Sequence, residues 1–226
     1  MKQLLMVATI LGAALVCTQS ASAQGGGRLY QEGRRGVSID LSLTGGQPMV
    51  SGGAGDIWDG AGGLGIVPGF GARLGYAWRR FGAQAGFDMT TANPSERDGS
   101  GVALFILGSW RIAPESRLNP MLGIGYVRQA ISGQFTSGEF PLETVTEQPD
   151  EYPPFEPGSV ATFANGVRVE VGGSVPVTAR SLDMTFGAMA DVMSFPNVQF
   201  NGYTHSLLDK GHGFWPRVAI GLRWHP

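Results

Sequence analysis

The chain is nearly free of cysteine, since Cys17 is the only one in 226 residues. That cysteine lies in an N-terminal segment expected to be removed, so no disulfide is expected in the remaining protein. The apolar run from Leu4 to Val16 has about half of the roughly 20 residues that a membrane-spanning helix needs. Charged residues make up only 15% of the chain, and neither sign dominates. These shortages argue against a disulfide-stapled domain and against a helical membrane anchor.

Residues 1–23 have the features of a secretory signal peptide. Lys2 precedes the apolar run, and Ala21-Ser22-Ala23 forms an A-x-A cleavage site. We therefore expect cleavage near Ala23, followed by an N-terminal tail over residues 24–35. A lipoprotein signal is the alternative because of Cys17, but the preceding Val16 is large where that signal has a small residue. Without the signal peptide the chain has 15 basic and 18 acidic residues, so nucleic acid is not expected as a partner.

Alternating apolar and polar residues dominate the rest of the chain, and helical periodicity is almost absent. The stretches "VSIDLSL", "GFGARLGYAW" and "RVAIGLRW" show this alternation. Many of the 36 glycines lie within such stretches, where they suit a tightly curved sheet with little space inside. The pattern predicts eight strands, at residues 37–43, 69–78, 81–89, 102–112, 121–128, 161–171, 182–192 and 217–226.

The expected connections between these strands alternate in length. About 20 residues follow the first strand, whereas only Arg79-Arg80 follow the second. Further long connections are expected at 132–159 and 193–212, and further short ones at "APESR" and "GGSVPVT". This order is typical of outer-membrane barrels with periplasmic termini. We therefore predict an all-β fold over residues 36–226: an eight-stranded antiparallel up-and-down transmembrane β-barrel with short periplasmic turns and long external loops.

The two faces of the predicted strands differ in chemistry. One face is apolar and is expected to meet lipid, with an aromatic rim at the periplasmic end formed by Trp78, Phe81, Trp110 and Trp224. The other face carries five acidic and five basic residues: Asp40, Arg73, Asp88, Arg111, Arg168, Glu170, Asp183, Asp191, Arg217 and Arg223. Because unpaired buried charge is costly, we expect these side chains to form a structural network of salt bridges that fills the lumen.

This pattern resembles the OmpA/OmpX-type small outer-membrane barrels over residues 36–224. The resemblance is one of architecture, and the C-terminal stretch "VAIGLRW" is similar to their assembly signal. It implies location in the cell outer membrane, contact with outer-membrane lipids, and assembly by the barrel-assembly machinery. Such proteins usually end on an aromatic residue, whereas His225 and Pro226 follow Trp224 here.

These features predict a structural or surface-interaction role, with no catalytic residue, no cofactor and no metal site. One alternative is a narrow solute pore, although no run of one charge sign suggests ion selection. Another is an enzyme that modifies lipid A, because His205, Ser206 and Asp209 supply hydrolase residue types. His205 and Ser206 are adjacent and are expected in a loop, so they do not form a shared site on a strand wall. The acidic, proline-rich segment 132–159 is expected to be a solvated external loop, with a cation-binding or adhesive loop as the alternative. The sequence names no external ligand.

Overall fold

The computed structural model describes residues 35–54, 67–92, 99–114, 116, 118–135, 158–177, 181–200 and 203–226. The predicted signal peptide and nearly all of the predicted tail therefore lie outside the described residues. The described residues form nine strands: β1 (Gly36–Gly46), β2 (Met49–Ser51), β3 (Val67–Ala77), β4 (Phe81–Ala92), β5 (Gly99–Arg111), β6 (Met121–Phe135), β7 (Gly158–Pro176), β8 (Leu182–Phe200) and β9 (Tyr203–Trp224). None of them forms a helix long and apolar enough to cross a membrane.

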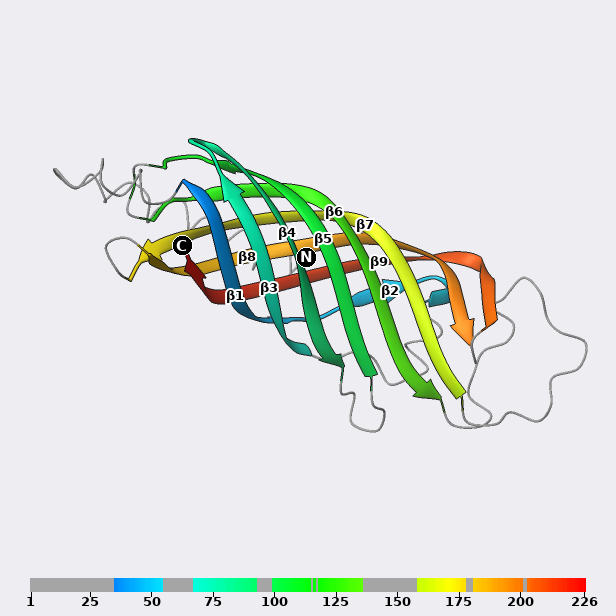
Figure 1. Ribbon diagram of the computed structural model, residues 1–226. Coiled ribbons are helices and arrows are strands. Elements are labelled where there is room, and N and C mark those ends of the chain that lie inside the picture. Colours follow the sequence, from blue (N-terminus) through cyan, green and yellow to red (C-terminus); the bar gives the residue numbers. More distant parts are fainter. Residues whose placement is uncertain are drawn as a thin grey trace, which may run out of the picture.

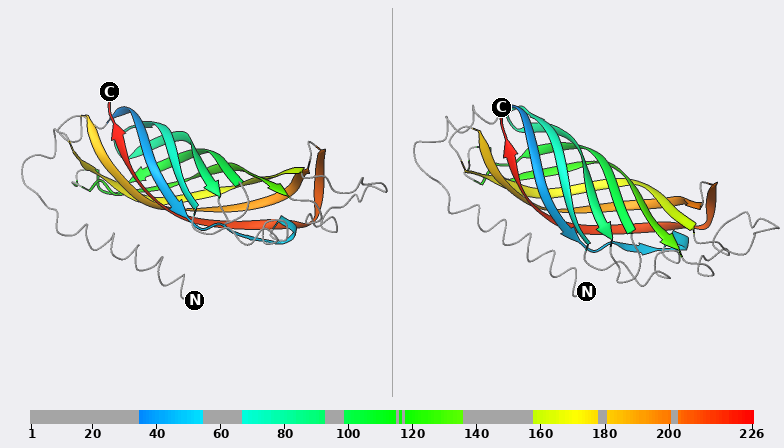
Figure 2. Two further views of the ribbon diagram at one scale, coloured as in Figure 1. Left: turned by 90° about the horizontal axis from the view of Figure 1, so that it is seen from below. Right: turned by 60° about the horizontal axis from the view of Figure 1, so that its bottom comes forward.

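The strands close into one antiparallel barrel, which Figure 1 and Figure 2 show from three directions. From β3 to β9 each strand pairs with the next one in sequence, and β9 pairs with β1. The short strand β2 follows β1 after a break of two residues and also pairs with β9. The barrel wall therefore has eight positions, as predicted, and β2 is an addition that the sequence pattern did not predict.

The stagger of the strands determines how much room the barrel encloses. Following the register once round the wall from Gly36 leads back to β1 at Gly46, ten residues further along. Eight strands with this stagger are tilted by about 40° from the barrel axis. An eight-stranded barrel of this kind is just wide enough for side chains to fill its interior.

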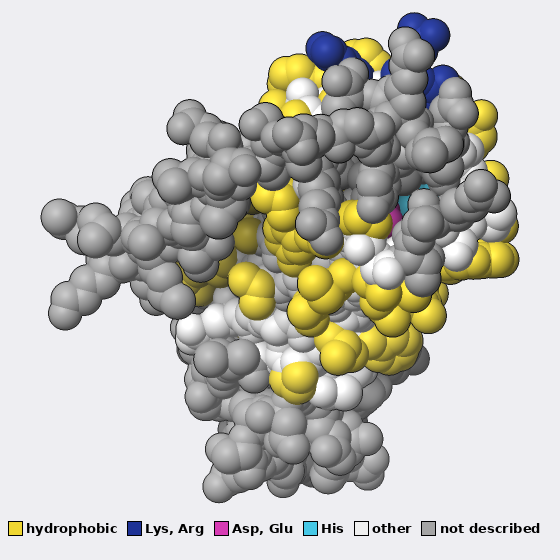
Figure 3. All heavy atoms as spheres, turned by 90° about the vertical axis from the view of Figure 1, so that its left-hand side faces the viewer, with side chains coloured by type: hydrophobic (Ala, Val, Ile, Leu, Met, Phe, Trp, Pro, Cys, Tyr) yellow, Lys and Arg dark blue, Asp and Glu magenta, His cyan; other side chains and the backbone are white. Residues whose placement is uncertain are grey.

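Side chains alternate between the two faces of the wall, and β1 shows this most simply. Its outward residues are 40–68% exposed, and they are Val37, Ile39, Leu41 and Leu43. Its inward residues are 5–8% exposed, and they are Ser38, Asp40, Ser42 and Thr44. Hydrophobic side chains likewise cover much of the described surface in Figure 3, where acidic side chains are nearly absent. The wall therefore turns its apolar face outward and its polar face inward.

All eight wall strands are longer than predicted, most of all β7, β8 and β9, which have 19, 19 and 22 residues. The predicted long connection at 193–212 is wrong, since only residues 201 and 202 separate β8 from β9. His205 and Ser206 consequently lie in a strand and not in a loop. The predicted loop 132–159 is shorter, because β6 and β7 take up its ends, and residues 136–157 lie outside the described part.

Irregular pairing interrupts the regular alternation of side chains in these strands. Where β8 passes from Phe195 to Asn197, the partner in β9 changes from Gly211 to Ser206. The four β9 residues 207–210 therefore face Pro196 alone, and the ribbon bends near this point (Figure 1). A smaller shift occurs in β7 between Phe163 and Asn165. Each shift breaks the period of two on which the strand prediction depends.

Candidate functional site

The barrel interior is the region where polar side chains gather. We call the end that holds the turns after β3, β5 and β7 the turn end, and the opposite end the loop end. All ten charged residues predicted for the lumen are buried, with at most 7% of any of them exposed. Toward the loop end the interior becomes an apolar core, which includes Phe105, Val127, Ile131, Val160, Phe195 and Trp215. The interior is thus divided into a charged layer and an apolar layer.

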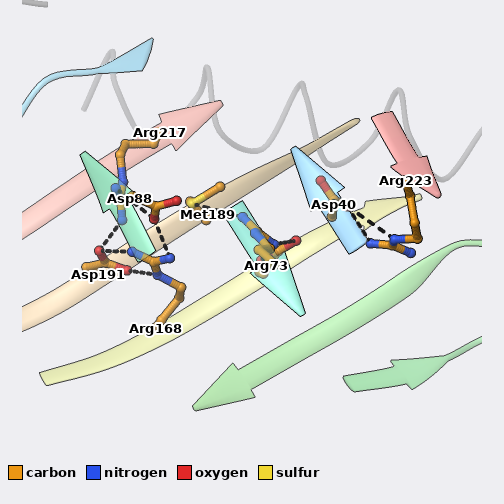
Figure 4. A network of polar contacts seen from close by, with 9 residues as sticks. Asp40, Arg73, Asp88, Arg168, Met189, Asp191, Arg217 and Arg223 are labelled. Atoms are coloured by element: carbon orange, nitrogen blue, oxygen red, sulfur yellow. Dashed lines mark hydrogen bonds and ion pairs between the residues drawn. The ribbon is translucent and has the colours of Figure 1, made fainter. Parts of the chain in front are cut away.

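A ring of four charges lies in the middle of the charged layer (Figure 4). Arg168 donates to Asp88 at 2.6 Å and to both carboxylate oxygens of Asp191 at 2.7 and 2.8 Å. Arg217 also contacts both acids, at 3.2 Å to Asp88 and in a short contact to Asp191. These residues come from β4, β7, β8 and β9, and their side chains are at most 1% exposed. The ring therefore links opposite sides of the wall through buried ion pairs.

Two further ion pairs lie between the ring and the turn end (Figure 4). Arg73 on β3 donates from Nη1 to both carboxylate oxygens of Glu170 on β7, at 2.8 and 2.7 Å. Arg223 on β9 donates to Asp40 on the adjacent strand β1, at 3.1 Å from Nε and 3.0 Å from Nη2. The first pair crosses the lumen, whereas the second joins neighbouring strands where the barrel closes. Both pairs are nearly buried and so act in a medium that strengthens them.

Aromatic rings separate the charged layer from the apolar layer. The guanidinium carbons of Arg168 and Arg73 lie 4.2 and 5.2 Å from the ring centre of Phe105. Arg217 makes the same kind of contact with Trp215, at 5.1 Å. Gly86 is opposite Phe105 in the register, and a Cβ atom there would lie 2.9 Å from the ring. The glycine therefore makes room for the ring, which supports two of the buried cations.

His225 closes the turn end of the lumen, although it was not among the residues predicted to face the lumen. Its side chain is 6% exposed, and its Nε2 atom lies 3.3 Å from Asp183 Oδ2. Ser174 donates to the same oxygen at 3.3 Å, and Asn119 donates to Ser174 at 3.2 Å. The sequence could have predicted this position, because His225 is spaced by an even number of residues from the inward-facing Arg217 and Arg223.

The four aromatic residues predicted for the rim lie on the outside of the barrel at the turn end. Trp78, Phe81, Trp110 and Trp224 are 44–64% exposed. Phe81 and Trp110 are direct partners across β4 and β5, and Trp78 packs edge-to-face on Tyr76 with ring centres 5.1 Å apart. Together with the outward apolar residues of all eight wall positions, they form what we call the apolar band.

The residues considered for catalysis do not form a site. His205 pairs with Val198 and Ser206 with Asn197, so the two side chains project to opposite faces of the β8–β9 ribbon. Asp209 is exposed in the four-residue irregularity of β9. Among the described residues, no group of three or more side chains has an arrangement that could hold a metal ion.

Comparison of the sequence with known protein families finds no match, and comparison with characterised proteins finds none either. The structure resembles that of Neisserial surface protein A, with 12% identity, a TM-score of 0.51, and coverage of 84% of this chain and 97% of that one. The chain has the fold of a small outer-membrane β-barrel. This barrel fold confirms the predicted fold class.

Two other solved structures resemble this barrel at lower scores. OprG, an outer membrane protein from Pseudomonas aeruginosa, has 10% identity and a TM-score of 0.49, over 84% of this chain and 95% of that one. A major outer membrane protein from Thermus thermophilus has 8% identity and a TM-score of 0.48, over 83% of this chain and 98% of that one.

Proposed function

We propose that the protein is an integral outer-membrane barrel with a structural or surface-interaction role, whose lumen is plugged by its own side chains. The observation that carries the proposal is the reversal of the usual arrangement of polar and apolar residues. Large apolar side chains such as Leu43, Leu74 and Ile106 are 60–68% exposed, while ten charged side chains are buried. An apolar surface this extensive is unfavourable in water and favourable in lipid.

Plugging is supported by the charge balance and by the packing of the interior. Five acidic and five basic side chains share the charged layer, so no ring of one sign selects an ion. Beyond the ring, Phe105 and Trp215 are 3% and 2% exposed, and the apolar core continues from them toward the loop end. An ion on this path would have to displace buried salt bridges and then enter an apolar layer.

Single-channel recording tests the plug. The protein in planar bilayers is expected to pass no steady current, because both layers of the interior exclude hydrated ions. A porin inserted in the same bilayers gives the reference signal, and heat-modifiable gel migration shows that the barrel is folded. A stable, ion-selective current through the unmutated protein would contradict the plug and would favour the narrow-pore alternative.

A surface role is supported by the length of the strands at the loop end. A tilted strand needs about 9–11 residues to cross a membrane, and β9 has 22. The extra length of β7, β8 and β9 therefore extends beyond the apolar band on the external side. Leu207, Val198 and Phe195 are at most 4% exposed there, so the projecting part has a packed interior of its own.

The geometry of β9 does not support catalysis by His205 and Ser206. His205 and Ser206 project to opposite faces, so the histidine is not placed to activate the serine. We expect His205→Ala and Ser206→Ala to leave the lipid A profile of the membrane unchanged. Mass spectra in which either variant loses a deacylated or acylated lipid A species would establish the enzyme alternative instead.

A further inference from the structure

A basic side chain stands on the outside of the barrel where the apolar band ends. Arg128 on β6 is exposed and has the same outward parity as Tyr126, Ile124 and Leu122, which are 52%, 63% and 40% exposed. Its partner across the sheet on β5 is Leu104, which is 57% exposed. A cation here is therefore bordered by apolar surface on the side that faces the turn end.

The level of Arg128 follows from the neighbouring strands. On each strand from β4 to β9 the outward apolar series gives way to a polar residue, and these residues are Thr91, Ser100, Arg128, Asn165, Ser194 and His212. From the register and the strand tilt, Arg128 lies about 20 Å from Trp224 along the barrel axis. The apolar band of an outer-membrane barrel is about 25 Å tall, so the Arg128 backbone lies about 5 Å inside its external edge. The long arginine side chain can extend over this distance and place its guanidinium group among the external headgroups.

Among the described residues, the surroundings of Arg128 offer hydrogen-bond donors and little negative charge. Asn165 on β7 is its direct partner in the register, and the Tyr126 hydroxyl donates to Asn165 Oδ1 at 2.5 Å. The amide NH2 group of Asn165 is thereby left to donate to another molecule. Within the described part of the chain, no carboxylate forms a salt bridge with Arg128.

We propose that Arg128, with Asn165 as a second donor, binds the phosphate of a phosphorylated glycolipid headgroup in the external leaflet. The proposal rests on the proposed membrane insertion and names the lipid class that this part of the outer surface binds. A guanidinium group matches phosphate with two parallel hydrogen bonds, and a phosphate monoester carries more negative charge than one carboxylate. A zwitterionic headgroup fits less well, because its own ammonium group already neutralises the phosphate.

The test uses the folded protein in nanodiscs of phosphatidylcholine that contain a small fraction of bisphosphorylated lipid A. Native mass spectrometry measures how much lipid A stays bound to the barrel. Arg128→Gln is expected to lower its retention about tenfold, and Arg128→Lys by less, because the ammonium keeps the charge but loses the paired geometry. Arg79→Gln is the matched control, since it removes an exposed arginine at the turn end and is expected to change nothing.

Two further arms identify what is bound. The unmutated protein is expected to retain dephosphorylated lipid A weakly. This retention should be no greater than that of bisphosphorylated lipid A by the Arg128→Gln variant. Inorganic phosphate at the concentration of the lipid is expected not to compete. Equal retention by the unmutated protein and Arg128→Gln would overturn the proposal, and so would equal retention of the two lipids or competition by free phosphate.

The same samples separate this proposal from the one it rests on. Heat-modifiable migration of each variant shows whether the barrel has folded in the nanodisc. If the barrel folds and inserts but retains lipid A equally well with and without its phosphates, only the lipid assignment is overturned. A barrel that does not enter the nanodiscs would overturn membrane insertion, and the lipid assignment with it.

Discussion

Asp191→Ala is expected to lower the free energy of unfolding by about 3–5 kcal/mol, because it removes one partner from a buried ion pair. Asp191 accepts hydrogen bonds from both Arg168 and Arg217, whose side chains are at most 1% exposed. Without it, two buried cations share Asp88 alone. Urea titration of the folded barrel in lipid vesicles measures the loss. The variant is also expected to show at most a weak, flickering conductance, because the apolar layer remains.

Two controls separate this effect from simple loss of a side chain. Asp209→Ala removes an exposed acid from β9 and is expected to change the free energy of unfolding by less than about 0.5 kcal/mol. Asp191→Leu combined with Arg217→Leu removes a matched pair, and should cost less than the two single changes added together. Two results would show that the paired charges are not strongly coupled. One is a double variant whose loss of unfolding free energy equals the sum of the two single losses. The other is a loss below about 1 kcal/mol for Asp191→Ala.

Leu222→Arg is expected to cost about 2–4 kcal/mol of stability in a bilayer, or less if the residue lies nearer an interface. Leu222 is 51% exposed and is paired with Leu41 of β1, which is 61% exposed. Both lie within the apolar band, so arginine at this point would place a charge against lipid tails. Refolding into vesicles and urea titration measure the cost.

The matched control is Ser100→Arg, which places the same side chain at the polar edge of the band. It is expected to cost about 0–1 kcal/mol, because charge near an interface reaches the headgroups. If Leu222→Arg folds into bilayers as well as Ser100→Arg does, the outward face does not meet lipid at Leu222.

Much of the wall was predictable because a barrel that is apolar outside and polar inside imposes a strict period of two. In β1 and β3 each outward apolar residue alternates with a small or polar one, and the structure gives these strands the predicted facing. The extension of β8 and β9 was not predictable from that period. Beyond the band the outward residues are no longer consistently apolar, and the shift at Phe195 breaks the alternation.

A different sequence signal marks the β8–β9 hairpin. Asn201-Gly202, the dipeptide between the two strands, is the preferred sequence of a two-residue hairpin turn. This signal predicts two long strands in place of the connection at 193–212. It also places His205 and Ser206 in a strand.

For the interior, the alternation of residues predicts which side chains face the lumen, but not which of them pair with one another. Parity alone assigns Arg73, Arg168 and Glu170 to one face, but it does not say which charges meet. The pairing of Arg73 with Glu170 crosses the lumen and depends on the stagger of ten residues, which becomes visible only when the barrel is closed. The place of Phe105 beneath two arginines depends on that stagger too, and on the space left by Gly86.

The most direct test of the account is a cysteine scan along β1 in lipid vesicles, because the chain from Gln24 onward has no cysteine of its own. Spin labels at Ile39, Leu41 and Leu43 are predicted to collide often with oxygen dissolved in the lipid. Labels at Ser38, Ser42 and Thr44 are predicted to be immobilised and to collide rarely with either oxygen or a water-soluble nickel chelate. A label at the exposed Arg79 gives the reference for water. Frequent nickel collisions at Ile39, Leu41 and Leu43, or no alternation along the strand, would contradict a barrel that turns its apolar face to lipid.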